Sequence, residues 1–262
     1  MFRMCRKSLA IAVATATLAF SSPQAYATIV LVETNMGNFE INLFDQTTPE
    51  NVANFLAYVK EGSYNNSLFS RSVKNFVVQA GGVRYSGNNT SPFTVIPRRG
   101  PVDNEPKLSN VRGTVAMAKL EDSAHSATME WFINVQNNAS NLDRQNSGYT
   151  VFGVITGSGM SVVDSMNELY LPGGTGPFRF TPLKNYNATD LANNVPVTAA
   201  NLVTIERITV INDSPTTAAN LNPALNTLAG KDNAGSGGGS SAPAFLIALT
   251  ALVGWRRRLL KP

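Results

Sequence analysis

The chain has 262 residues, of which 43% are hydrophobic and 15% are charged, enough for one folded domain with a full core. Its formal net charge of +4 would suit a nucleic-acid partner, so the positions of the charges matter. A single histidine, His125, and a single cysteine, Cys5, exclude a disulfide framework and a Cys/His zinc cluster. We expect chemistry that uses no metal, no cofactor and no imidazole relay.

Residues 1–27 have the pattern of a secretory signal peptide. A positive start precedes an apolar stretch and a small-residue cleavage pattern, namely Arg3, Arg6 and Lys7, then residues 9–20, then Ala25-Tyr26-Ala27. We predict that the mature chain begins at Thr28. The alternative is an N-terminal membrane anchor, for which the apolar stretch is too short.

Residues 28–44 predict two strands, 28–34 and 38–44, because both runs are rich in β-branched and aromatic residues. Residues 35–37 join them as a hairpin turn. A helix then begins at Thr48-Pro49-Glu50, where proline suits the first helical position. Its apolar residues recur at helical spacing, at Val52, Phe55, Leu56 and Val59.

Further β-type runs follow at residues 67–69, 76–79, 113–118, 131–135, 150–155 and 202–211, and residues 160–169 predict a second helix. Eight strands with two helices favour a mainly β fold, a closed eight-stranded antiparallel barrel capped by two α-helices. Closure removes the exposed edges of an open sheet. Long loops remain at 84–110 and at 171–200, and the second is longer than a compact barrel needs.

The C-terminal part of the chain changes in composition after Leu221. Residues 213–241 are rich in Gly, Ser and Asn and predict a flexible linker. Residues 242–262 combine a short apolar stretch, marginal for a membrane span, with a basic cluster that would stay on the cytoplasmic side. This order resembles the bacterial GlyGly-CTERM sorting tail. The resemblance implies a transient anchor cut by a rhomboid-type sorting protease; a permanent tail anchor is the alternative.

The basic excess lies in these two ends. Seven of the 21 Lys and Arg residues fall within residues 1–27 and 242–262, which contain no Asp or Glu. Residues 28–241 therefore carry 14 basic against 17 acidic residues, a net charge of −3. We expect no nucleic-acid partner, because the basic pI reflects membrane targeting.

Two blocks of sequence carry the candidate chemistry. The first is Phe69-Ser70-Arg71, a four-residue spacer, and Phe76-Val77-Val78-Gln79-Ala80-Gly81-Gly82. The second contains Arg112-Gly113-Thr114-Val115-Ala116-Met117-Ala118, Ser126-Ala127-Thr128, Trp131-Phe132-Ile133, Leu142-Asp143 and Gly148-Tyr149-Thr150-Val151-Phe152-Gly153. In order and spacing, these blocks resemble the signature of the cyclophilin family of peptidyl-prolyl cis-trans isomerases, over residues 28–212.

The resemblance implies a monomeric cyclophilin-like domain, 28–212, that acts on proline-containing segments of secreted or outer-membrane proteins. With the signal peptide, it implies a periplasmic, membrane-tethered or cell-surface location. The residue that it implies as catalytic is Arg71. The residues that it implies for substrate binding are Phe76, Val77, Gln79, Ala118, Glu130, Phe132, Leu142 and Tyr149.

The chemistry of proline isomerisation suits these residues. Rotation about an X-Pro bond faces a barrier of about 18–20 kcal/mol from amide resonance, so a catalyst must bind the twisted amide better than either planar form. The twisted nitrogen regains a lone pair, which the permanently charged Arg71 can contact with its rigid fork of donors. Gln79 would orient Arg71 or hold a substrate carbonyl. The proposed apolar seat for the proline ring is Phe76, Val77, Phe132 and Leu142.

Several positions depart from the family pattern. Glu130 stands where glutamine is usual, and we expect its charge to pair with Arg71 and compete with substrate. The spacer 72–75 lacks the usual Pro-Gly, so we expect a looser loop before Phe76. Tyr149 stands where many relatives carry histidine. The sequence favours an active isomerase; the alternative is a catalytically weak cyclophilin-like module that binds proline-containing peptides at the cell surface.

Overall fold

The computed structural model describes residues 28–214, 217–218 and 220–231. The predicted signal peptide, 1–27, and the predicted anchor or sorting tail, 242–262, lie outside the described residues, as do residues 232–241 of the predicted linker. Within the described part, no helix is long and apolar enough to cross a membrane.

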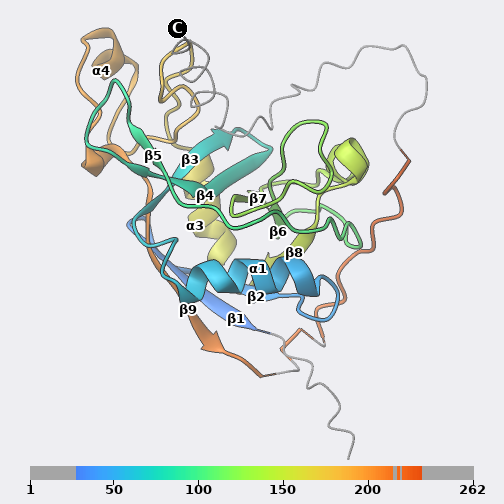
Figure 1. Cartoon of the computed structure of the whole chain (residues 1–262). Coiled ribbons are helices and arrows are strands. Elements are labelled where there is room, and N and C mark those ends of the chain that lie inside the picture. Colours follow the sequence, from blue (N-terminus) through green and yellow to red (C-terminus); the bar gives the residue numbers. More distant parts are fainter. Residues whose placement is uncertain (1–27, 215–216, 219, 232–262) are drawn as a thin grey trace, which may run out of the picture.

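The described chain forms a single antiparallel sheet with helices on both sides (Figure 1). The strands are β1 Ile29–Thr34, β2 Phe39–Leu43, β3 Ser67–Val73, β4 Val77–Tyr85, β5 Phe93–Val95, β6 Thr114–Met117, β7 Trp131–Asn134, β8 Val151–Ile155 and β9 Thr204–Asn212. The helices are α1 Pro49–Lys60, α2 Ala139–Leu142, α3 Gly159–Asn167 and α4 Ala188–Ala192, with 3-10 turns η1 Gln145–Ser147 and η2 Ala199–Asn201.

Eight strands close into a barrel. Their order is β3-β9-β1-β2-β8-β6-β7-β4, and an additional β3–β4 pairing joins the two ends. The ninth strand, β5, pairs with the far end of β4, at Val83–Tyr85, beyond the part that pairs with β7. The predicted closed eight-stranded barrel is therefore confirmed, and β5 is an addition that lay inside the predicted loop 84–110.

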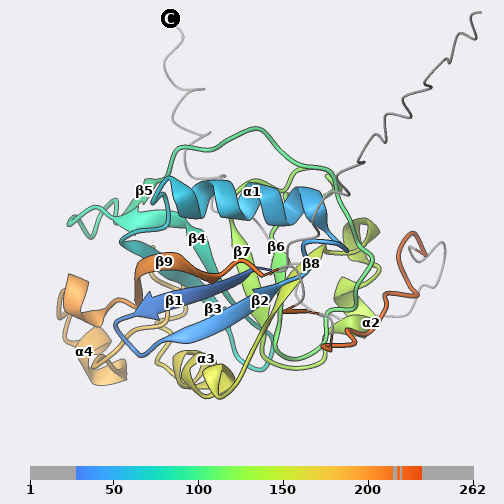
Figure 2. The same cartoon turned by 90° about the horizontal axis from the view of Figure 1, so that it is seen from below.

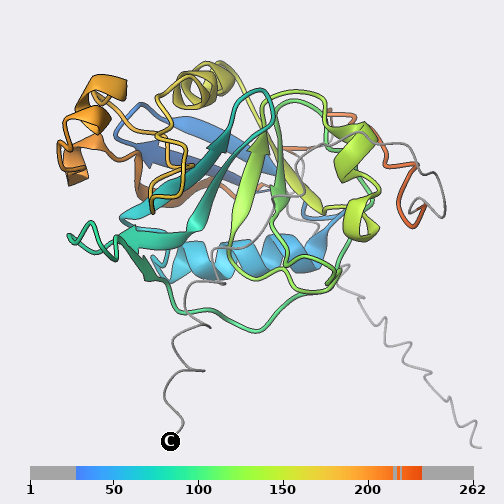
Figure 3. The ribbon, with the colours of Figure 1, turned by 90° about the horizontal axis from the view of Figure 1, so that it is seen from above.

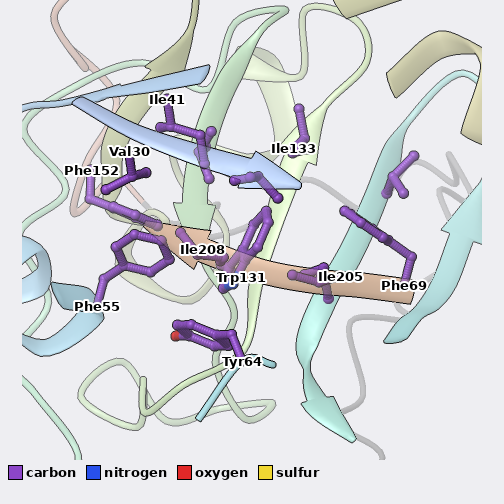
Figure 4. Close-up of a cluster of buried hydrophobic side chains, with 14 of the residues drawn as sticks. Val30, Ile41, Phe55, Tyr64, Phe69, Trp131, Ile133, Phe152, Ile205 and Ile208 are labelled. Carbon is purple, nitrogen blue, oxygen red and sulfur yellow. The ribbon is translucent and has the colours of Figure 1, made fainter. Parts of the chain in front are cut away.

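The barrel interior is filled by alternate residues of the strands and by the inner faces of α1 and α3. Trp131 lies fully buried at its centre, with edge-to-face contacts to Phe55, Tyr64 and Phe69 at centroid distances of 6.0, 6.4 and 5.9 Å (Figure 4). Figure 2 shows α1 and α3 on opposite sides of the barrel, as the predicted pair of capping helices requires. The core therefore fixes which face of each strand points outward.

The long loop 171–200 has a hydrophobic cluster of its own. Phe178, Leu183, Tyr186 and Val197 are buried against Leu68 of β3 and other barrel residues. Two short helical segments, α4 and η2, lie in this loop and were not predicted. The loop is thus a packed extension of the barrel.

Part of the predicted linker 213–241 also has defined contacts. The amide of Ser109 donates to the carbonyl of Ala224 at 2.8 Å, and the amide of Asn226 donates to the carbonyl of Lys107 at 2.9 Å. Residues 217–218 and 220–231, which we call the C-terminal strap, follow the barrel surface beside α2 (Figure 2). The composition of these residues had predicted a flexible linker without packing contacts.

Candidate active site

The sheet register places one side chain from each of three neighbouring strands in a row. Arg71 of β3 pairs with Gln79 of β4, and Gln79 pairs with Phe132 of β7. Ala116 of β6 continues the row beside Phe132. Figure 3 shows these four strands side by side, coloured from teal to green.

This row lies on the outer face of the barrel. Val78, Ala80, Trp131 and Ile133 belong to the interior cluster, whereas Phe132, one residue from two of them, belongs to a separate outer cluster. Because successive strand residues face opposite sides, the interior residues of β4, β6 and β7 direct Gln79, Ala116 and Phe132 outward. In β3, a register shift between Phe69 and Arg71 brings Arg71 opposite Gln79. The row therefore lies outside the barrel interior, but its side chains are still buried: Phe132 and Ala116 are fully buried, and Arg71 is 7% exposed.

The polar half of the site is a chain of charged and amide groups. The Arg71 guanidinium donates to Gln79 Oε1 at 3.5 Å, and Gln79 Nε2 donates to Glu130 Oε2 at 2.8 Å. Glu130 also forms an ion pair with Arg98, with a nitrogen-to-oxygen distance of 3.6 Å. Glu130 is thus linked to Arg71 through Gln79, and the charges of Glu130 and Arg71 also act on each other directly.

Burial changes the titration of these groups. Desolvation lowers the pKa of Arg71 to about 10, partly offset by the charges of Tyr149 and Glu130, so Arg71 stays charged at pH 7. Desolvation likewise raises the pKa of Glu130 above 4.5, although the hydrogen bond from Gln79 and the charges of Arg98 and Arg71 oppose the rise. The polar half therefore combines a cation and a carboxylate that burial makes easier to neutralise.

The apolar half is the outer hydrophobic cluster. Its buried members include Val77, Phe132, Leu142 and Tyr149, and the partly buried Phe76 and Ala118 pack against it. The rings of Phe132 and Tyr149 meet edge to face with centroids 5.7 Å apart. Burial raises the pKa of Tyr149 to about 12, so its hydroxyl stays protonated at neutral pH.

The structure therefore brings all nine predicted site residues into one region, while their roles stay predictions. A cavity of about 70 Å³ lies at its edge, between Ala118, Glu130, Arg98 and Lys119. Nothing in the sequence pattern had marked Arg98 or Lys119. Within the described part of the chain, no three His, Cys, Asp or Glu side chains gather as a metal site would need.

The family model for cyclophilin-type peptidyl-prolyl cis-trans isomerases matches residues 29–186. This chain belongs to that family. Peptidyl-prolyl cis-trans isomerase A of Dickeya dadantii is 38% identical over 186 residues, which cover 69% of this chain and 94% of that protein. Peptidyl-prolyl cis-trans isomerase B of Escherichia coli is 39% identical over 142 residues, which cover 53% of this chain and 83% of that protein.

The solved structures agree on the fold. A cyclophilin-type isomerase from Cryptosporidium parvum superimposes with a TM-score of 0.51 at 20% identity, covering 72% of this chain and 99% of that one. At this identity the similarity supports the barrel fold only. The arrangement of the site's side chains rests on the contacts described above.

This cyclophilin-family site rests on a buried polar network that sequence reasoning missed. The Asp143 carboxylate accepts from Ser109 Oγ at 2.5 Å and from the amide of Asn110 at 2.7 Å. Asn138 Nδ2 donates to the carbonyl of Phe76 at 2.9 Å and to Asn134 Oδ1 at 2.7 Å. Asp143 stands beside Leu142 in the second motif block, which was the one available signal; the asparagines match no pattern of chemistry.

The spacer before Phe76 is held by α3 of this cyclophilin-family domain. Asn167 Nδ2 donates to Ser72 Oγ at 2.8 Å and to the carbonyl of Val73 at 3.0 Å, and Asn167 Oδ1 accepts from the amide of Asn75. Asn75 takes a left-handed conformation with φ of 53°, which asparagine tolerates better than most residues. These contacts replace the loose loop expected from the missing Pro-Gly.

Proposed function

We propose that this chain is a peptidyl-prolyl cis-trans isomerase that accelerates rotation of X-Pro bonds in exported proteins. The observation that carries the proposal is the row of Arg71, Gln79 and Phe132, in which the sheet register sets a charged donor, an amide and an aromatic ring side by side on adjacent strands. Membership of the cyclophilin family supports the reaction class, because relatives at 38–41% identity are named as such isomerases.

The geometry suggests how the barrier is lowered. An apolar seat holds the proline ring while Arg71 donates to the nitrogen lone pair that exists only in the twisted amide. Because Arg71 is largely buried, its charge acts with little screening by water. The contact strengthens only at the transition state, which raises kcat rather than ground-state binding.

The test is the isomerisation rate of a proline peptide, measured by NMR exchange between cis and trans signals, with the full chain and with Arg71→Ala. We expect a rate above background that falls in Arg71→Ala. No rate above background in the wild-type chain, or an unchanged rate in the variant, would exclude the mechanism.

A second candidate is a peptide-binding module with little turnover. The observation that favours it is the bond between Gln79 and Glu130, because it occupies the amide that would orient Arg71 or hold a substrate carbonyl. Peptide binding by NMR titration, without accelerated exchange between isomers, would support this candidate. A rate that rises in Glu130→Gln would show that the carboxylate restrains a working isomerase.

We further propose export, on the N-terminal pattern and the net charge of −3 of residues 28–241. Mass spectrometry of the protein recovered from cells tests this, because it determines both ends of the chain. A new N-terminus at Thr28 supports export, and an intact Met1 argues against cleavage. Loss of residues 242–262 would support a sorting protease over a permanent anchor.

A further inference from the structure

The C-terminal strap lies against the apolar half of the site. Ala218 and Leu221 pack on the cluster that contains Phe132, Leu142 and Tyr149. At its start, Asn42 Nδ2 donates to the carbonyl of Thr217 at 3.0 Å, which fixes the strap on β2. The family model ends at residue 186, so this support lies beyond the part of the chain that the model matches.

Asn226 connects the strap to the site by hydrogen bonds. Its Nδ2 donates to the carbonyl of Asp143 at 2.9 Å, and its own amide donates to Lys107. Its Oδ1 accepts from the amides of Leu228 and Ala229, at 2.7 and 3.0 Å. One side chain thus shapes the turn of the strap and binds the backbone next to Leu142.

The loop 142–149 carries two predicted substrate-binding residues at its ends, Leu142 of the seat and Tyr149. The amide of Tyr149 donates to the carbonyl of Leu142 at 2.9 Å, which closes the loop. Asn110 Nδ2 donates to the carbonyl of Tyr149 at 3.1 Å and to the Asp143 carboxylate at 3.0 Å. The bond from Asn226 to Asp143 therefore joins the strap to the group of bonds that place Leu142 and Tyr149.

The strap and the loop also meet closely at Gly148. A Cβ there would lie 2.7 Å from the Asp143 carbonyl oxygen and 3.1 Å from Asn226 Nδ2. Gly148 has φ of 81°, in the region that favours glycine. The loop is thus in contact with the strap one residue before Tyr149 as well as at Asp143.

We propose that the C-terminal strap sets the affinity of the site for the proline-containing segment, with Asn226 as its positioning residue. The proposal rests on the proposed peptide site and adds a residue outside the family motif. Holding Leu142 and Tyr149 in place before binding removes an ordering cost from association. The seat contacts the proline ring in the planar and the twisted states of the amide alike. A less ordered seat therefore weakens the binding of both states equally.

The test is Asn226→Asp in the full chain. Aspartate keeps the acceptor for Leu228 and Ala229, and it replaces the donor to Asp143 by an oxygen that repels the Asp143 carbonyl oxygen. The turn of the strap is therefore kept while its contact with the loop 142–149 is lost. We expect KM and the dissociation constant of a proline peptide to rise about three- to tenfold, with kcat within about twofold, as the loss of one hydrogen bond implies. Amide exchange at Tyr149 is expected to accelerate as well.

The matched control is Asn201→Asp, because Asn201 has the same chemistry beside η2. Its Nδ2 donates to the carbonyl of Lys184 at 3.0 Å, and its Oδ1 accepts from the amide of Thr198 at 2.9 Å. Figure 1 shows this region, in orange, across the barrel from the red strap. We expect the control to shift thermal stability by a similar amount and to leave KM and Tyr149 exchange unchanged.

The proposal would be overturned by unchanged amide exchange at Tyr149 in Asn226→Asp, or by faster exchange with unchanged peptide affinity. Equal rises in KM for both variants would also overturn it, because general loosening would then explain them. Failure of the isomerase assignment is separate. A wild-type chain without turnover excludes that assignment, while the dissociation constant and the exchange rates still decide the role of the strap.

Discussion

The two halves of the site are built in different ways. The polar half, from Arg71 through Gln79 to Glu130, consists of side chains that contact one another across adjacent strands. The apolar half is shaped by loops whose backbone carbonyls are held by asparagine side chains, as Asn138 holds Phe76. Strand register thus determines which groups meet the amide, and loop anchoring determines how well the proline ring fits. The first should govern kcat and the second KM.

The largest effect is expected for Arg71→Ala, which tests whether the polar half governs kcat. We expect kcat to fall about 100-fold or more, in line with loss of one preorganised transition-state donor. Peptide affinity should change little, because the contact exists mainly in the twisted amide. The measurement is NMR exchange at saturating peptide. A loss of affinity as large as the loss of kcat would contradict the division between the halves. Arg71→Lys keeps the charge without the fork and should recover only part of the rate.

The apolar half is tested by Phe132→Leu. We expect KM to rise about tenfold, with kcat reduced far less, because the ring contributes to the seat in every state of the substrate. Phe152→Leu is the matched control, since Phe152 is equally buried but belongs to the barrel interior. Both variants should lower the free energy of unfolding by about 1–2 kcal/mol. A similar KM in the two variants would show that packing in general, and not the seat, sets affinity.

Anchoring of the seat is tested by Asn138→Ala. The change leaves the carbonyl of Phe76 and Asn134 Oδ1 without this donor in a buried setting, so we expect a loss of about 1–3 kcal/mol in the free energy of unfolding. KM should rise several-fold while kcat holds. Urea unfolding and steady-state kinetics on the same preparation measure both effects. Unchanged KM beside the lost stability would make this network a purely structural one.

The smallest expected effect is the pH dependence of Glu130→Gln. Burial raises the pKa of Glu130 in the folded chain, so the folded state binds more protons than the unfolded state as the pH rises above 4.5. The stability that the neutral carboxyl provides is present below that value and is lost as the pH rises through the raised pKa. Thermal unfolding from about pH 4 to about pH 8 should show the unfolding temperature of the variant rising relative to that of the wild type as pH increases. A constant difference would contradict the raised pKa.

Much of the barrel and the polar half could be predicted from the sequence. Apolar alternation marked the strands, and the motif that resembles the family signature contains Arg71 and Gln79, two members of the row. Elements whose formation depends on contacts distant in sequence could not be predicted. β5 has three residues in a loop of mixed composition, and its order comes from pairing with β4.

The C-terminal strap shows the same limit more strongly. Its Asn-rich composition is typical of a linker, yet Asn226 is ordered by the carbonyl of a residue 83 positions earlier. Arg98 and Glu130 are likewise 32 positions apart, so no local pattern could indicate their ion pair. Hydrogen bonds from side chains to the backbone leave little trace in a hydropathy pattern. Because such bonds hold the loops of the apolar half, its arrangement could not be predicted.

The position of β9 has a consequence for how the chain folds. β9 pairs with β1 on one side and with β3 on the other, so Ile29 of β1 lies opposite Asn212, near the end of the described domain. A chain that emerges with its N-terminus first therefore keeps two unpaired strand edges until residue 212 is available. Such edges bind other strands readily, and contacts so distant in sequence form slowly. We therefore expect closure of the barrel to be a late event in folding, preceded by an open state with exposed strand edges.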